Sequence, residues 1–196
     1  FVKRIAPDGL EFLKFGKAET DFISILFCDI RSFTSLSEKM SPQELVDFLN
    51  DFFKRMTEPI SNNKGFVDKF IGDGVMALFS IPEEPNAADA LNSVIAAISM
   101  QQQIDSFNKD NKMSEEKRLR IGIGIHSGPV IIGTVGSEER MESTVTGDTV
   151  NLASRLEGLT KFYRSKILIS QSTFEFIDSE SSLEFRELDL VKVKGK

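Results

Sequence analysis

The chain has 196 residues, a length that suits one domain and argues against two full ones. Its 24 basic and 30 acidic residues give a net charge of −6, which argues against a nucleic-acid-binding surface because such surfaces are normally basic. This charge still allows one small polyanion to be held through a metal ion. The single Cys excludes an intramolecular disulfide framework, and the single His excludes a metal site built from several histidines.

No apolar run approaches the roughly 20 residues that cross a bilayer. The first residues, Phe-Val-Lys-Arg, show no apolar segment of a signal peptide. Because the chain does not begin with Met, we expect a fragment of a longer protein, with a sensor or a membrane anchor upstream. Turn and polar residues predict flexible loops over 82–86 and 109–117.

Hydrophobic periodicity divides the chain into strands and helices. Nearly continuous apolar runs indicate buried strands, spacings of three and four residues indicate amphipathic helices, and two short runs around Gly-Asp-Gly indicate a hairpin. The predicted elements are, in chain order, a strand over 22–30, a helix over 41–60, hairpin strands over 66–71 and 75–79, a helix over 86–108, strands over 119–126 and 130–135, a helix over 148–161, a strand over 166–169, a short helix over 171–178, and strands over 183–188 and 190–193.

Capping and turn residues set two of these boundaries. Ser41, Pro42 and Glu44 form a capping box at the start of the helix over 41–60. Ser-Gly-Pro at 127–129 is expected to separate two strands. The first half then has the order β-α-β-β-α-β, a split βαβ arrangement with both helices on one face of the sheet. We therefore predict an α+β fold with a ferredoxin-like core.

Two aspartates follow predicted strands. Asp29 ends the apolar strand over 22–30, where a buried carboxylate requires a partner or a metal. Asp73 lies in the hairpin turn, where Gly-Asp-Gly is ordinary turn chemistry. Taken singly, each is also explained as a turn or capping residue. On adjacent strands they would meet, and Mg²⁺ prefers such oxygen ligands; two ions roughly 3.5–4 Å apart hold both oxygens of a phosphoryl displacement.

Further candidates have an ordinary explanation beside a functional one. Asn151 and Arg155 are four residues apart and are expected to share one helix face, which suits a phosphate with a nearby hydroxyl. The alternative is a solvated Arg on an amphipathic helix. Lys69 fits an exposed strand position, and Thr144 fits simple β-propensity.

The remaining polar candidates are assigned structural roles. Lys192, Lys194 and Lys196 form a basic tail, and such tails are usually solvated. We expect His126 to make a structural hydrogen bond beside a turn, and Cys28 to be an inert thiol in the core.

Apart from the lysines of the tail, these residues fall within four stretches that occur in a fixed order. They are 26–34 (Leu-Phe-Cys-Asp-Ile-Arg-Ser-Phe-Thr), 67–73 (Val-Asp-Lys-Phe-Ile-Gly-Asp), 124–128 (Gly-Ile-His-Ser-Gly) and 144–155 (Thr-Val-Thr-Gly-Asp-Thr-Val-Asn-Leu-Ala-Ser-Arg). Together they closely resemble the catalytic domain of class III nucleotidyl cyclases. The resemblance implies a central mixed sheet, a cyclase catalytic domain over 20–196, and a lead-in over 1–19 from an upstream region.

The resemblance also implies conversion of ATP to 3′,5′-cyclic AMP and pyrophosphate, assisted by two Mg²⁺ or Mn²⁺ ions. The ribose 3′-hydroxyl would attack the α-phosphorus in line. The matching positions are Asp29, Asp73 and the Ile30 carbonyl for metal; Asn151 and Arg155 for ribose orientation and transition-state stabilisation; Lys194, with Lys196 as the alternative, for the triphosphate; Phe33 and Thr34 for further nucleotide contacts; and Lys69 with Thr144 for the purine.

Nucleotide choice and phosphate binding follow from the same resemblance. The Lys69–Thr144 pair resembles bacterial adenylyl cyclases, whereas guanylyl members carry Glu and Cys there. One departure is Gly122, where some members have a phosphate-contacting Arg. Arg120 lies two residues earlier on the same strand face and is a candidate replacement.

Finally, the resemblance implies a head-to-tail homodimer with two shared sites, in a cytoplasmic domain tethered through upstream regions. The aspartates of one chain would meet the Lys, Thr, Asn and Arg residues of the other, and this chain carries both half-sets. The alternatives are a guanylyl cyclase and a catalytically silent nucleotide-binding dimerisation module. A diguanylate cyclase is disfavoured because its glycine-glycine-acidic turn signature is missing.

Overall fold

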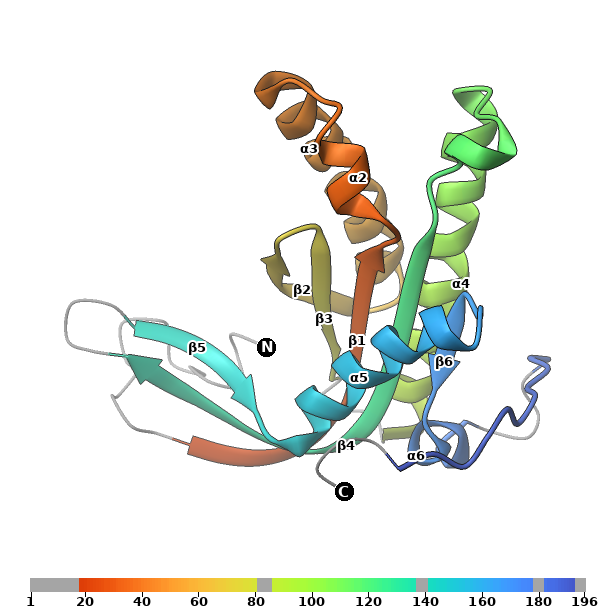
Figure 1. Cartoon of the computed structure of the whole chain (residues 1–196). Helices are drawn as coiled ribbons and strands as arrows, with labels where there is room; N and C mark the ends of the chain where they lie inside the picture. Colours follow the sequence, from red (N-terminus) through yellow and green to blue (C-terminus); the bar gives the residue numbers. More distant parts are fainter. Residues whose placement is uncertain (1–17, 81–85, 137–140, 178–181, 193–196) are drawn as a thin grey trace.

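A computed structural model describes residues 18–80, 86–136, 141–177 and 182–192 (Figure 1). Within these ranges the strands form one sheet in the order β2-β3-β1-β4-β5, with β6 also paired to β4. The sheet is mixed, because β6 runs parallel to β4 and every other pair is antiparallel. The elements are β1 (Ala18–Ile30), α2 (Phe33–Ser37), α3 (Pro42–Asn62), β2 (Gly65–Ile71), β3 (Gly74–Phe79), α4 (Asn86–Asp110), a 3₁₀ turn (Glu115–Lys117), β4 (Ile121–Gly136), β5 (Met141–Thr146), α5 (Asp148–Phe162), β6 (Ile167–Ile169) and α6 (Gln171–Glu175).

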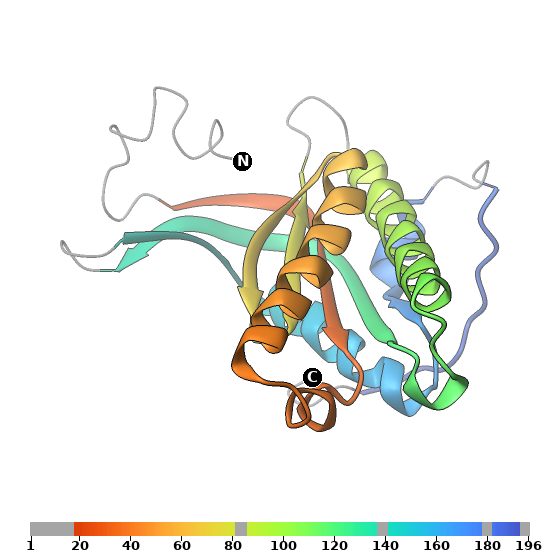
Figure 2. The same ribbon diagram turned by 90° about the horizontal axis from the view of Figure 1, so that it is seen from above.

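The two faces of the sheet are covered by different helices. Figure 2 shows α3 and α4 on one face and α5 on the other. Side chains alternate along β1: Leu26 and Cys28 join the core beneath α3 and α4, whereas Ile23 and Ile25 pack with Ala153 of α5. The predicted α+β class, and the placement of both helices of the β-α-β-β-α-β core on one face, are therefore confirmed.

Helix α3 begins as its sequence predicts. The backbone N–H of Glu44 donates to Ser41 Oγ at 3.4 Å, and the backbone N–H of Ser41 donates to Glu44 Oε2 at 2.8 Å. Pro42 occupies the first turn, where no intrahelical donor is needed. None of the helices in the described ranges combines the length and hydropathy that a bilayer span requires.

The predicted break in β4 is wrong. The strand continues from Ile121 to Gly136 through Ser127, Gly128 and Pro129. The Pro129 carbonyl accepts a hydrogen bond from Thr149 Oγ1 at 2.6 Å, on the edge away from β1. Residues 127–129 lie between the segments of β4 that pair with β6 and with β5, so no neighbouring strand requires the N–H that proline lacks.

The C-terminal strands predicted over 183–188 and 190–193 are also wrong for the part described. Residues 182–192 are extended but pair with no strand among the described residues. Side-chain contacts anchor this segment instead: the Phe185 ring packs edge-on against Phe174, and Tyr163 Oη donates to Asp189 Oδ2 at 2.7 Å. The described part of this segment therefore contacts α6 and the end of α5 and does not form part of the sheet.

Other boundaries differ more modestly. Helix α2 and strand β5 were not predicted, because five or six residues of weak periodicity carry little signal. Of the predicted loops, 82–85 lies outside the described residues, Asn86 begins α4, and the region 109–117 contains the end of α4 and the 3₁₀ turn.

Helix α5 packs directly on β4 at Gly124. A Cβ atom at this position would lie 2.1 Å from the backbone nitrogen of Glu157 and 2.6 Å from the Ala153 carbonyl oxygen. Gly124→Ala therefore forces the helix backbone outward, and we expect the free energy of unfolding to fall by about 2 to 3 kcal/mol. Urea denaturation measures this change.

The matched control is Gly158→Ala, where a Cβ meets nothing within 4 Å. Alanine favours the helix over glycine, so this variant should keep or gain up to about 1 kcal/mol. Equal losses in both variants would show that close packing at Gly124 is not the cause.

Candidate active site

The end of β1 brings the two candidate aspartates together. Cys28 pairs with Val75 at the start of β3, so Asp29 lies beside the hairpin turn that carries Asp73. The turn approaches closely because Gly74 has no side chain: a Cβ there would lie 3.4 Å from Asp29 Oδ1 and 3.1 Å from the Cys28 carbonyl oxygen. The β2–β3 turn therefore brings Asp73 close to Asp29.

The nearby Asp73 carboxyl group changes the protonation of Asp29. Burial, followed by the charge and hydrogen bond of Asp73 and then the charge of Glu157, raises the pKa of Asp29 to about 7. Near neutral pH, without a metal, a proton is therefore retained between two carboxylates that repel each other. A divalent cation would relieve this repulsion, so the donor set fits Mg²⁺ or Mn²⁺, which need few protein ligands. No group of three or more metal-ligating side chains occurs in the described ranges, which leaves this pair as the metal candidate.

The other residues predicted near the metal lie next to Asp29. Ile30 is the last residue of β1, and its side chain is buried in the core. Phe33 and Thr34 form the first turn of α2, with Phe33 packed against the core and Thr34 exposed. The preceding residue, Ser32, has φ 58°, a left-handed conformation that turns the chain from β1 into α2.

Sequence reasoning missed an ion pair beside this cluster. Arg31 Nη1 lies 3.0 Å from Glu157 Oε1 of α5. The guanidinium lies over Gly122, where a Cβ would fall only 1.6 Å from Arg31 Nη2. Arg120, the predicted replacement for a cation at position 122, is exposed and donates instead to the Glu115 carbonyl at 3.4 Å. Arg31 therefore fills the space that the missing side chain leaves.

Asn151 and Arg155 lie on α5, and both are accessible to solvent, Asn151 more than Arg155. An α-helix turns about 100° per residue, which places Glu157 about 200° round the helix from Arg155 and about 240° from Asn151. Since Glu157 faces Arg31 at the metal end of β1, the Asn151–Arg155 face points away from Asp29 of the same chain. The structure therefore does not unite the two half-sets within one chain.

The purine candidates lie at opposite ends of the sheet. Lys69 is on edge strand β2, and its Nζ lies 3.3 Å from Oδ2 of Asp68, whose side chain is 5% exposed. Thr144 is on β5, where it pairs with Gly133. Lys194 and Lys196 lie outside the described residues. Asp68 was not predicted as a partner of Lys69, because adjacent residues of a strand normally point to opposite faces of the sheet. Here the register shift between Val67 and Lys69 interrupts that alternation.

The His and the Cys have structural positions. His126 Nδ1 lies 2.7 Å from Ser170 Oγ, so the predicted structural hydrogen bond is confirmed, although it forms in mid-strand and not at a turn. Cys28 is 1% exposed, and burial raises the pKa of its thiol, as expected for an inert core residue.

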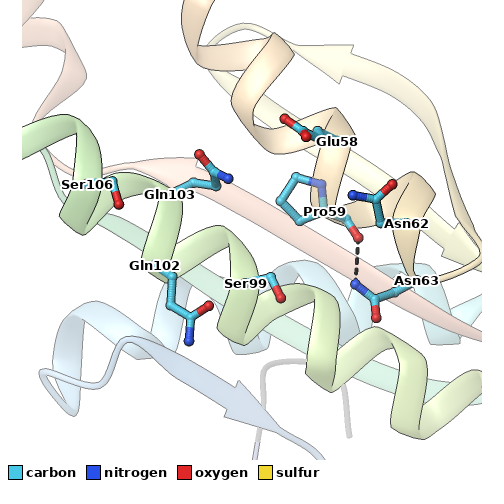
Figure 3. A pocket seen from close by; sticks show the side chains of 8 residues that line it. All are labelled: Glu58, Pro59, Asn62, Asn63, Ser99, Gln102, Gln103 and Ser106. Carbon is cyan, nitrogen blue, oxygen red and sulfur yellow. Dashed lines mark hydrogen bonds between the residues drawn. The ribbon is translucent and has the colours of Figure 1, made fainter.

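A separate groove of about 390 Å³ lies between α3 and α4 (Figure 3). Amide and hydroxyl groups line most of it, including Asn62 and Gln102, and Asn63 Nδ2 donates to the Pro59 carbonyl at 2.8 Å. None of the candidate site residues contributes to it. The candidate residues that the structure describes lie instead at the end of β1, in the β2–β3 turn and the start of α2, and on β2, β5 and α5.

Comparison with known proteins shows the family of this chain. Residues 15–196 match the family described as the adenylate and guanylate cyclase catalytic domain. The chain belongs to this family. An adenylate cyclase of Anabaena cylindrica is 48% identical over 201 residues, covering 100% of this chain and 39% of the relative.

Solved cyclase structures show the same fold. The adenylyl cyclase CyaB of P. aeruginosa has a TM-score of 0.73 and 33% identity, covering 82% of each chain. The guanylyl cyclase Cya2 has a TM-score of 0.78 and 34% identity, covering 91% of this chain and 88% of that one. This chain spans only 39% of the length of the Anabaena adenylate cyclase, so the other regions of that relative have no counterpart in the match.

Proposed function

We propose that this domain is an adenylyl cyclase that converts ATP to 3′,5′-cyclic AMP and pyrophosphate as a homodimer. The observation that carries the proposal is the placement of Asp29, at the end of β1, beside the β2–β3 turn that holds Asp73. A chain of the cyclase family with this pair, and with Asn151 and Arg155 accessible on α5, has the groups that the reaction needs.

Asp29, Asp73 and the Ile30 carbonyl would hold two Mg²⁺ or Mn²⁺ ions. When bound, the ions would acidify the 3′-hydroxyl and neutralise the leaving pyrophosphate. Phe33 and Thr34 begin α2, four and five residues after Asp29, and would contact the nucleotide there. The carboxylates concentrate negative charge where the polyphosphate must be neutralised, so the protein recruits cations to the site rather than presenting a basic surface.

The second half-set would act on the ribose and the phosphates. Asn151 would orient the ribose through its amide, and Arg155 would stabilise the charge that builds on the α-phosphate. Lys194, or Lys196 in its place, would bind the β- and γ-phosphates. Each group presents donors to an oxygen that gains charge, which contributes most in a site that excludes water.

The orientation of α5 supports the proposed dimer. Asn151 and Arg155 face away from Asp29 and Asp73 of their own chain, so a complete site needs these residues from a second chain. A head-to-tail dimer would form two such sites. We place the domain in the cytoplasm, where ATP is supplied, with regulation and any membrane tether in upstream regions of the protein.

Lys69 and Thr144 are proposed to recognise the adenine. Lys69→Glu with Thr144→Cys should shift the ratio of ATP to GTP turnover by about a hundredfold toward GTP, because the new groups complement a different set of base donors and acceptors. Initial rates with each nucleotide measure the shift. Lys109→Glu with Ser106→Cys makes the same charge reversal and a similar hydroxyl-to-thiol change on exposed positions of α4, and should leave the ratio unchanged.

The proposed function is tested by product analysis. The purified chain is incubated with ATP or GTP and with Mg²⁺ or Mn²⁺, and the products are separated by chromatography. Cyclic AMP from ATP is expected, with little cyclic GMP from GTP. Cyclic GMP as the main product would identify a guanylyl cyclase, and nucleotide binding without either product would identify a silent regulatory module.

A further inference from the structure

We infer that Arg31 and Glu157 form a charge-compensating pair that sets how strongly Asp29 and Asp73 attract a divalent cation. The inference rests on the proposed function, since it concerns the same metal site. It assigns positioning roles to two residues that belong to neither proposed half-set. They do not contact the reacting atoms; they determine the net charge around the carboxylates that hold the metal.

The geometry of the pair is specific. The Arg31 and Glu157 side chains are only 21% and 14% exposed, and their charged atoms lie 3.0 Å apart. Arg31 reaches Glu157 because Gly122, beneath it, has no side chain. On the strand side, the Arg31 backbone N–H donates to the Arg120 carbonyl at 2.8 Å, which holds the start of the α2 loop against β4.

Glu157 is the third carboxylate near the metal aspartates. Its partner Arg31 lies over Gly122, and Gly122 pairs directly with Asp29 in the β1–β4 ladder, so the ion pair lies next to the aspartates. The charge of Glu157 accordingly helps to raise the pKa of Asp29. Glu157 comes from α5, whereas the two aspartates come from β1 and the β2–β3 turn. Without compensation, it would add a negative charge to a cluster that already repels itself.

Among the residues that the structure describes, Arg31 is the cation that pairs with Glu157. Among the described residues, Glu157 is the one carboxylate in an ion pair with Arg31. Arg31 Nη2 is buried and makes no hydrogen bond within the described ranges. The pair is therefore one-to-one: loss of Arg31 leaves an extra negative charge near the aspartates, and loss of Glu157 leaves an extra positive charge.

These two losses predict opposite effects on cation binding. Arg31→Met should tighten Mn²⁺ binding by about threefold to tenfold at low salt, and Glu157→Gln should weaken it by a similar factor. The double variant should return close to the wild-type affinity, because the net charge is restored. A purely structural role would instead make both single variants weaker, through disorder at the end of β1.

Binding of Mn²⁺ alone to the full chain is measured by the electron paramagnetic resonance signal of the free ion. Opposite shifts in Mn²⁺ affinity that shrink as ionic strength rises support the inference; shifts of the same sign, or none, overturn it.

Further variants keep the test sound. If Arg31→Met fails to fold by circular dichroism, Arg31→Gln replaces it, and Arg31→Lys, which retains the charge, should stay near the wild-type affinity. The Lys166–Asp105 pair, with both side chains 66% exposed, gives the matched controls Lys166→Met and Asp105→Asn, which should change Mn²⁺ affinity little.

Failure of this inference is distinguishable from failure of the proposed function. Opposite shifts in Mn²⁺ affinity without any cyclic nucleotide product would support the charge pair and reject the cyclase reaction. Cyclic AMP formation with shifts of the same sign would retain the reaction and reject the charge pair. Asp29→Asn should weaken Mn²⁺ binding in either case, and unchanged binding in that variant would overturn the inference at its base.

Discussion

Asp73→Asn should abolish cyclase activity, by about a thousandfold or more, while making the metal-free protein more stable above pH 7. The activity falls because one of the two proposed metal carboxylates is lost. The stability rises because the amide removes a charge that repels Asp29 and can donate a hydrogen bond to its carboxylate. Function and stability are therefore opposed at this position, as expected where like charges are held together for a ligand.

The pH dependence fixes the sign of this effect. The pKa of Asp29 is raised in the folded protein to about 7 from an ordinary value of 3.8. Its contribution to stability is therefore fully present at pH values below the ordinary pKa and is lost as pH rises through about 7. In Asp73→Asn the loss should be smaller, leaving a gain of about 1 kcal/mol at pH 8, a modest value because Asp29 is partly solvated.

Two measurements test this prediction. Chromatography of reaction products gives the activity, and urea denaturation in the presence of a chelator gives the free energy of unfolding from pH 4 to pH 8. Asp105→Asn removes an exposed carboxylate on α4 and should change neither quantity appreciably. A loss of stability in Asp73→Asn at pH 8 would contradict the repulsion between the two aspartates.

Mixing two inactive variants should restore activity. An Asp29→Ala chain keeps its Asn151 and Arg155, and an Arg155→Ala chain keeps its aspartates, so each mixed dimer contains one intact site and one doubly defective site. Random pairing of equal amounts would recover about a quarter of the wild-type activity, since half of the dimers are mixed and each has one site of two. The physical basis is the orientation of α5, which directs Arg155 away from Asp29 of its own chain.

Activity as a function of the mixing ratio measures this recovery and should be greatest at equal amounts. The control mixes Asp29→Ala with Asp73→Ala chains, whose defects lie in the same half-set, so that no mixed dimer has an intact site. Recovery in the control, or none in the test mixture, would contradict a site shared between chains.

Local sequence patterns predicted most elements of the fold. The strand ending at Asp29, the capping box of α3, the hairpin around Asp73 and the helix carrying Asn151 are all found close to their predicted bounds. Each depends on interactions within a few residues: alternation, helical spacing, capping and turn chemistry. The placement of Asp29 beside Asp73 also followed, because both lie at ends of strands that pair in a split βαβ core.

Predictions failed where distant contacts override local signals. A proline normally ends a strand, yet β4 continues through Pro129. The strands β6 and β5, which pair with β4 on the edge away from β1, both leave residues 127–129 unpaired. The segments 183–188 and 190–193 were predicted as strands, yet Phe185 packs on Phe174 of α6 and Asp189 accepts from Tyr163 at the end of α5, without sheet pairing among the described residues. In both cases the deciding groups lie far away along the chain, where a local pattern contains no information about them.

Sequence by itself determined the class of fold, the placement of Asp29 and Asp73 as neighbours, and the resemblance to cyclases, because these reside in motifs and in short-range periodicity. Tertiary structure alone decided that Arg31 pairs with Glu157 over Gly122, and that α5 turns Arg155 away from Asp29. The sequence shows that Gly122 has no side chain, but it does not show that the Arg31 side chain occupies the space. Only packing α5 across β4 brings Glu157 to Arg31, and the same packing divides the proposed site between two chains.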